Sequence, residues 1–145
     1  MRTDNTISLI GRVRGQANKL IYRELHDRGH KGLAPSHGNV LAVLLSKGEM
    51  TKTEISNAIG RDRSTVTVLL KKLEKNGYIA TRVNDEDSRS AIVYLTEKGE
   101  AFREGFAEIS EKIYDIQFRD MTEEQITQFK SCLEILYTNF KSINE

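Results

Sequence analysis

The segment from residue 78 to residue 99 constrains the fold most, because two apolar runs flank a short polar stretch. "YIATRV" (78–83) and "SAIVYL" (90–95) are rich in β-branched and aromatic residues, whereas "NDEDSR" (84–89) is entirely polar. Two such runs with a short polar link predict the antiparallel strands of a β-hairpin. Thr96 follows the second run and predicts the N-cap of another helix.

Most of the remaining chain has the apolar spacing of helices. Apolar residues recur at intervals of three and four within 7–20, 40–45, 66–73, 102–116 and 126–140, which predicts amphipathic helices. We expect Ser36 to cap the second helix, Thr51 and Glu54 to form a capping box, and Thr122 and Gln125 to form another. The fold class is therefore mainly α with a small β-hairpin.

Length and hydropathy favour one domain in the cytoplasm. A chain of 145 residues suits a single domain. The longest apolar run, "VLAVLL" (40–45), is too short for a bilayer, and the N-terminal stretch lacks the apolar core of a signal peptide. With one cysteine there is no internal disulfide, so we expect cytoplasmic localisation and no membrane partner.

Charge is distributed unevenly, although the net charge is only +1. Residues 47–82 hold eight basic and four acidic residues, whereas residues 97–145 hold six basic and eleven acidic residues. A basic middle segment with an acidic tail favours a polyanion as partner, with the acidic part turned elsewhere.

The order of elements, a short helix, a turn at Gly60, a second helix and then a hairpin, is that of a winged helix-turn-helix. The second helix of such a pair enters the major groove, and Arg, Ser, Thr and Lys are suited to bases and phosphates. For the predicted double-stranded DNA contact we select Arg61, Arg63, Ser64, Thr65, Thr67, Lys71, Lys72, Asp87 and Arg89.

The polar hairpin tip has its own predicted role. An arginine at this tip suits a narrow minor groove, where the negative potential is strongest. Asp87 lies two residues before Arg89, so we expect its carboxylate to hold the guanidinium outward while Arg89 contacts DNA. We expect Asp85 and Glu86 to point away or to cap the turn. The alternatives are an ordinary solvated turn and a calcium loop, for which the ligand pattern is wrong.

These residues resemble the MarR family of bacterial transcription regulators. The family's wing signature is D-x-R, five residues, then L-T-x-x-G, and the chain matches each fixed position with Asp87, Arg89, Leu95, Thr96 and Gly99. "STVTVLLKKLEKNGYI" (64–79) is similar to the family's recognition helix and its exit into the wing. The chain departs from the family at one position, where members often carry arginine and this chain has valine at position 68.

The resemblance implies a single MarR-type domain over 1–145, with a DNA-binding lobe at about 35–95 and dimerisation helices at about 1–28 and 97–145. It implies a ligand-responsive repressor that binds a pseudo-palindromic operator as a homodimer. The near-heptad apolar stripes favour the same dimer, and the interface we expect comprises Ile7, Ile10, Phe106, Ile109, Ile113, Phe129, Leu133, Leu136 and Phe140.

The resemblance also implies a small aromatic or anionic effector, bound between the dimer helices and the DNA-binding lobe. Candidate contacts are Arg14, Tyr22 and His37, although a histidine at the start of a helix is more commonly solvated or capping. His26 and His30 have helical metal-ligand spacing, but no third ligand is evident, so we expect no metal and no cofactor.

The alternative to DNA binding is a winged-helix module that binds protein without contacting DNA. We do not expect an enzyme, because the sequence has no nucleophile elbow, phosphate loop or pair of convergent titratable groups. We expect Cys132 to be a small buried residue of the last helix rather than a redox sensor.

Overall fold

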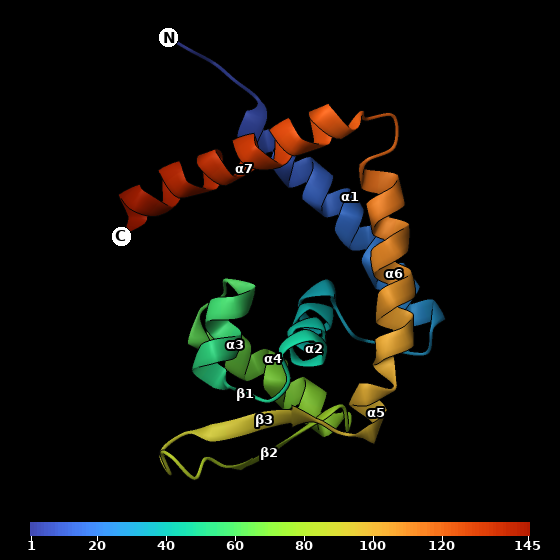
Figure 1. Ribbon diagram of the computed structural model, residues 1–145, viewed down its shortest axis with the longest axis vertical. Coiled ribbons are helices and arrows are strands. Elements are labelled where there is room, and N and C mark those ends of the chain that lie inside the picture. Colours follow the sequence, from blue (N-terminus) through green and yellow to red (C-terminus); the bar gives the residue numbers. More distant parts are fainter. The chain divides into compact units, whose positions relative to one another are not determined.

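The computed structural model describes residues 1–145 as seven helices and three short strands (Figure 1). The helices are α1 (Thr6–Asp27), α2 (Pro35–Lys47), α3 (Lys52–Ile59), α4 (Arg63–Lys75), α5 (Glu97–Glu100), α6 (Phe102–Gln117) and α7 (Glu123–Asn144). The strands are β1 (Met50–Thr51), β2 (Ile79–Val83) and β3 (Ala91–Leu95). The chain divides into two compact units, residues 1–110 and 111–145. No helix has the length and apolarity needed to cross a membrane.

The sheet lies in the first unit and has the strand order β1-β3-β2. Strands β2 and β3 form the predicted antiparallel hairpin, from the pair Ile79 and Leu95 to the pair Val83 and Ala91. Strand β1 pairs antiparallel with β3 on its other edge, with Met50 opposite Val93. Sequence periodicity did not reveal β1, because a strand of two residues has no alternation to detect.

The core of the first unit forms where α2, α3 and α4 pack on one another and on the sheet. Val40, Leu41, Leu44 and Leu45 of α2 are all buried, as their spacing predicts. Helix α4 buries Val66, Leu69 and Leu73, whereas Leu70 is only half-buried. Each of these helices therefore has one face fixed by the core and one face left for other contacts.

The start of α2 differs from the prediction. Ser36 is not the N-cap, because Pro35 occupies the first helical position and Ala34 precedes the helix. Proline suits that position, since its fixed φ is helical and its missing N–H would have no partner there. The Ala34 N–H donates to Nδ1 of His37 at 2.9 Å. A buried histidine therefore supplies the capping interaction expected of the serine.

The other predicted N-caps are confirmed, but the capping box of Thr51 and Glu54 is not completed, because the Glu54 carboxylate accepts the Thr51 hydroxyl and not the Thr51 N–H. Thr51, Thr96 and Thr122 accept the backbone N–H three residues on, at 3.2, 3.2 and 3.1 Å. Gln125 returns a bond from its side chain to the Thr122 N–H at 2.9 Å, which completes that capping box. The fifth predicted helix is divided into α5 and α6, however, because the helix is interrupted at Ala101.

The second unit contains the end of α6 and all of α7, and α7 buries none of its residues within the chain. Cys132 is exposed on this helix, so the expectation of a buried cysteine is wrong for the single chain. The prediction placed Cys132 beside the apolar stripe at Leu133, and that stripe is itself not buried within the single chain.

The motif from Thr96 to Gly99 joins the end of the hairpin to the end of α4. The Thr96 N–H donates to the Tyr78 carbonyl at 3.1 Å, and its hydroxyl donates to the Gly77 carbonyl. Gly99 is buried, and a Cβ there would overlap the Tyr78 carbonyl oxygen and lie 2.9 Å from Leu95 Cδ2. Only glycine therefore fits this close approach of α5 to the start of β2.

We predict that Gly99→Ala destabilises the first unit, because the added methyl requires a backbone shift at Tyr78. The expected loss is about 1–3 kcal/mol in the free energy of unfolding, measured by urea titration. Gly105→Ala is the matched control, since its Cβ would meet only Arg28 Cδ at 3.7 Å, an ordinary contact. Equal stabilities of the two variants would contradict the packing argument.

We also predict that acidification destabilises the fold through His37, which is 7% exposed. Burial lowers the pKa of His37, and nearby Lys72 lowers it further. Because the folded pKa lies below the unfolded value, this stabilisation is complete above about pH 6.5 and is lost as the pH falls below it. Protonation at Nδ1 also removes the acceptor of the Ala34 N–H.

Urea titrations at pH 7.5 and pH 5.5 measure the effect at one protein concentration. His37→Gln retains an acceptor at this position but does not titrate, so its stability should fall less between the two pH values than that of the unaltered chain. His26→Gln, at an exposed position, should fall as much as the unaltered chain. If the stability of His37→Gln fell between the two pH values as much as that of the unaltered chain, His37 would not contribute to the acid destabilisation.

Candidate nucleic-acid interface

The turn between α3 and α4 is set by Gly60 and Asp62. Gly60 has a left-handed φ of 69° and ends α3, a conformation that glycine adopts without strain. Asp62 is the N-cap of α4 and accepts the Thr65 N–H at 2.7 Å and the Ser64 hydroxyl at 2.8 Å. These hydrogen bonds lower the pKa of Asp62, with the Thr65 N–H first. Sequence analysis missed this residue, although an aspartate directly before the apolar stripe is an N-cap signal.

The outward face of α4 lies opposite the buried stripe. Because the helix advances about 100° per residue, Ser64, Val68, Lys71 and Lys75 share this face, and all four are exposed. Arg63 is also exposed in the first turn. The structure therefore presents hydroxyl, apolar and cationic side chains together on one helical surface.

Besides Ser64 and the pair at the hairpin tip, three of the residues predicted to bind DNA have side chains that bond to other parts of the chain. Arg61 donates to the Ser36 hydroxyl at 3.2 Å, and Lys72 donates to the Gly32 carbonyl. The Thr67 hydroxyl accepts from Lys52 Nζ at 2.7 Å. These contacts fix α4 against α2, α3 and the loop before α2. Thr65 is half-buried, and its N–H is used by the cap.

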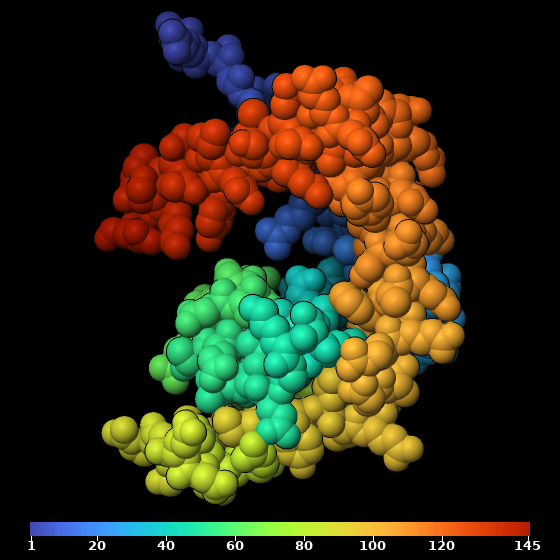
Figure 2. Space-filling model, viewed as in Figure 1, coloured from blue at the N-terminus to red at the C-terminus, as the bar shows by residue number.

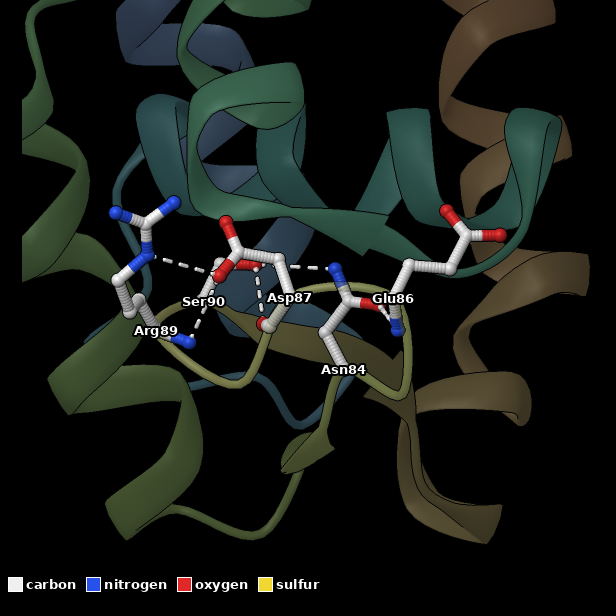
Figure 3. A network of polar contacts seen from close by, with 5 residues as sticks. All are labelled: Asn84, Glu86, Asp87, Arg89 and Ser90. Carbon is white, nitrogen blue, oxygen red and sulfur yellow. Dashed lines mark hydrogen bonds and ion pairs between the residues drawn. The ribbon is translucent and has the colours of Figure 1, made fainter.

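Asp87 and Arg89 meet at the tip of the hairpin, as the sequence predicts (Figure 3). Oδ1 of Asp87 accepts the Arg89 N–H at 3.0 Å and Arg89 Nε at 3.1 Å. These two bonds hold the pKa of Asp87 below its usual value, the backbone bond contributing most. The Arg89 side chain is nevertheless 90% exposed, so the carboxylate orients the guanidinium without covering it.

Asn84 and Ser90 close the tip and were not singled out from the sequence. Asn84 Nδ2 donates to the Ser90 hydroxyl at 3.0 Å, and its Oδ1 accepts the Glu86 N–H at 3.1 Å. The Ser90 N–H donates to the Asp87 carbonyl at 3.0 Å. Figure 3 shows the Glu86 carboxylate on the side of the tip away from Arg89. The turn is thus stabilised locally, with Glu86 pointing away as expected.

The hairpin carries a second arginine that sequence analysis did not select. Arg82 on β2 pairs with Glu49 at 2.5 Å, so its charge is largely compensated within the chain. The neighbouring Val83 is exposed. Figure 2 shows the hairpin at the margin of the first unit, where its tip is open to solvent.

The residues predicted for a dimer interface differ in exposure. Most are exposed or half-buried, whereas Ile109 is 5% exposed and belongs to the chain's own core. Exposed apolar side chains concentrate on α1 and α7, namely Ile7, Leu9, Ile10, Val13, Phe129, Leu133, Ile135, Tyr137, Phe140 and Ile143. Such a concentration exceeds the scattered exposure of a monomer surface.

The proposed effector contacts are not joined by any hydrogen bond or ion pair. Arg14 and Tyr22 are exposed on α1, whereas His37 is buried at the start of α2 and bonded to Ala34. His26 and His30 are engaged separately, with Asp27 at 3.6 Å and with the Tyr78 hydroxyl at 2.8 Å. No cluster of three potential metal ligands is present.

Comparison with known proteins supports this arrangement. A family model described as "MarR family" matches residues 31–90. The chain is 28% identical over 104 residues to the Pseudomonas putida transcriptional repressor IacR, covering 72% of this chain and 62% of that protein. It is 33% identical over 76 residues to the Staphylococcus aureus transcriptional regulator SarZ, covering 52% of this chain and 51% of that protein. The matched region thus spans less than two thirds of either relative.

A solved structure also matches the fold. The S. aureus MepR–DNA complex superposes with a TM-score of 0.86 at 22% identity, covering 94% of this chain and 99% of that chain. At this identity the likeness shows a shared fold, and it confirms the predicted class of a winged helix-turn-helix with additional helices.

Proposed function

We propose that the chain is a member of the MarR family and a sequence-specific DNA-binding transcription regulator. We propose further that it is a ligand-responsive repressor that binds a pseudo-palindromic operator as a homodimer in the cytoplasm. The observation that carries the proposal is the pairing of an exposed cationic and hydroxyl face on α4 with an oriented arginine at the hairpin tip.

The α4 face supplies the groove contacts in this proposal. Arg63 and Ser64 are exposed in its first turn, the part of a recognition helix that faces base edges. Lys71 is exposed in the second half of the helix. Arginine binds the O6 and N7 atoms of guanine in a fork, and lysine and serine bind phosphates. Arg61, Thr67 and Lys72 instead position the helix, since their side chains bond within the chain.

The hairpin tip supplies the minor-groove contact. Arg89 is free of core packing but held by two bonds to Asp87. A side chain that is already oriented loses less conformational entropy when it binds. The hydrogen bonds of Asn84 and Ser90 stabilise this geometry where the tip joins the two strands.

A homodimer provides two such surfaces. Exposed apolar residues of α1 and α7, among them Ile7, Ile10, Phe129, Leu133 and Phe140, would be covered by a second copy of the chain. A two-fold dimer presents two recognition helices to successive major grooves, which requires an operator with two related half-sites.

An effector would act on the spacing of the two α4 helices. Arg14 offers a positive charge and Tyr22 an aromatic ring on the exposed surface of α1, which suits a small aromatic or anionic molecule. Such a ligand changes DNA affinity only if it binds one spacing more tightly than the other.

We predict that Arg89→Ala lowers operator affinity by about 1–3 kcal/mol while the oligomeric state is unchanged. The reason is that the variant removes the only side chain held outward by Asp87 at the tip. Fluorescence anisotropy with an operator selected from random duplexes measures the loss. Asp87→Asn should give a smaller loss, because it weakens orientation but leaves the guanidinium.

Arg119→Ala is the matched control, since Arg119 is exposed in the segment between α6 and α7. The operator affinity of Arg119→Ala should equal that of the unaltered chain. Unchanged affinity in Arg89→Ala would refute the role of the tip. Absence of any salt-dependent binding to duplex DNA would instead favour the protein-interaction module, because phosphate contacts make affinity fall steeply with salt.

We predict that Leu133→Asp disrupts the dimer, because it places a charge in the apolar surface of α7. Light scattering should show a monomeric mass, with circular dichroism confirming that helices remain. Ser131→Asp is the control, since two residues earlier on the helix it lies on the opposite side from Leu133. A dimer that survives Leu133→Asp at the same concentration would exclude this surface as the interface.

A further inference from the structure

Val68 is the most exposed apolar side chain of α4, at 68% of its full surface. Ser64 lies one turn before it, and Lys71 and Lys72 follow about one turn after it. The side chain lines a surface hollow together with Lys71, Lys72, Lys75 and Asn76. An apolar group is thus placed in the middle of the surface proposed to enter the major groove, with cations around it.

Neither packing nor helix formation explains a valine at this position. Val68 lies on the side of α4 opposite the buried Val66, Leu69 and Leu73. A β-branched residue is also a weaker helix former than alanine, lysine or glutamate. Valine has no hydrogen-bonding group, so it makes neither the guanine fork nor the phosphate bond open to an arginine.

One feature of the major groove suits this side chain. Among the base edges displayed there, only thymine carries an apolar group, its C5-methyl, and apolar side chains contact it. Lys71 and Lys75 lie beside Val68 and are exposed, so their ammonium groups would bind phosphates and bring the valine close to the bases.

We propose that Val68 contacts the C5-methyl group of one thymine in each half-site and selects a T·A pair at that position. This inference rests on the proposed DNA-binding function. It assigns a base preference to a residue with no hydrogen-bonding side chain, at the position where this chain departs from the arginine common in its family.

The test replaces thymine by deoxyuridine, which differs only in lacking the C5-methyl group. Duplexes are first selected from a random pool with the full-length chain, and each thymine of the enriched sequence is then replaced in turn. At one position in each half-site, the replacement should lower affinity about fourfold, the value of one buried methyl group.

The Val68→Ala variant identifies the side chain responsible. It should bind the thymine duplex more weakly than the unaltered chain, and its loss on replacement by deoxyuridine should fall below twofold. Val83→Ala is the matched control, because Val83 is equally exposed at 66% but lies on the hairpin. This control should retain the fourfold difference.

The outcomes separate the inference from the proposed function. If no duplex is enriched over random DNA, both fail. If enriched duplexes bind but no thymine responds to deoxyuridine, the assignment of Val68 is overturned while DNA binding stands. A thymine that responds equally in the unaltered chain and in Val68→Ala overturns the assignment in the same way.

Discussion

The close approach of α5 to the start of β2 is the contact on which the arrangement of α4 and the hairpin depends. Gly99 lies against the Tyr78 carbonyl, and Thr96 bonds both that carbonyl and the Gly77 carbonyl. Lys98 adds a bond to the Asn76 carbonyl at 2.8 Å and lies 4.4 Å from the centre of the Tyr78 ring. Residues 76–78 connect α4 to β2, so these contacts hold the end of the recognition helix and the base of the hairpin in one rigid arrangement.

That arrangement links two surfaces, the outward face of α4 and the hairpin tip, each of which is stabilised by its own local hydrogen bonds. The start of α4 is fixed by Asp62, and the hairpin tip by Asn84, Asp87 and Ser90. Neither cap nor tip specifies the distance between the two surfaces. The contact of Gly99 with Tyr78 does so, because it sets where β2 leaves α4 and where β3 ends. Geometry of this kind is needed for a protein that contacts the major and minor grooves together.

Features that depend on neighbouring residues were predictable from the sequence. The caps at Thr51, Thr96 and Thr122 and the bond between Asp87 and Arg89 join groups two or three positions apart, and the hairpin joins two runs that only a short polar stretch separates. Features that depend on distant contacts were not. Lys72 bonds to Gly32 and Arg61 to Ser36, and nothing in the local pattern distinguishes them from Lys71 and Arg63. Likewise β1 is visible only through its pairing with β3, and the exposure of Cys132 only through the packing of α7.

The side chains at the start of α4 and along it fall into two groups, and this division has a consequence for specificity. Arg61, Thr67 and Lys72 are bonded within the chain, and the Ser64 hydroxyl donates to Asp62, so releasing them to DNA would require those bonds to be replaced. A bound helix gains most from side chains that have no such bonds to lose. In the proposed complex these are Arg63, Val68 and Lys71, one of which is apolar. Discrimination between operators would therefore rest on few side chains. The apolar contact of Val68 with a methyl group would contribute a larger part of that discrimination than in a recognition helix with a cation at each of these positions.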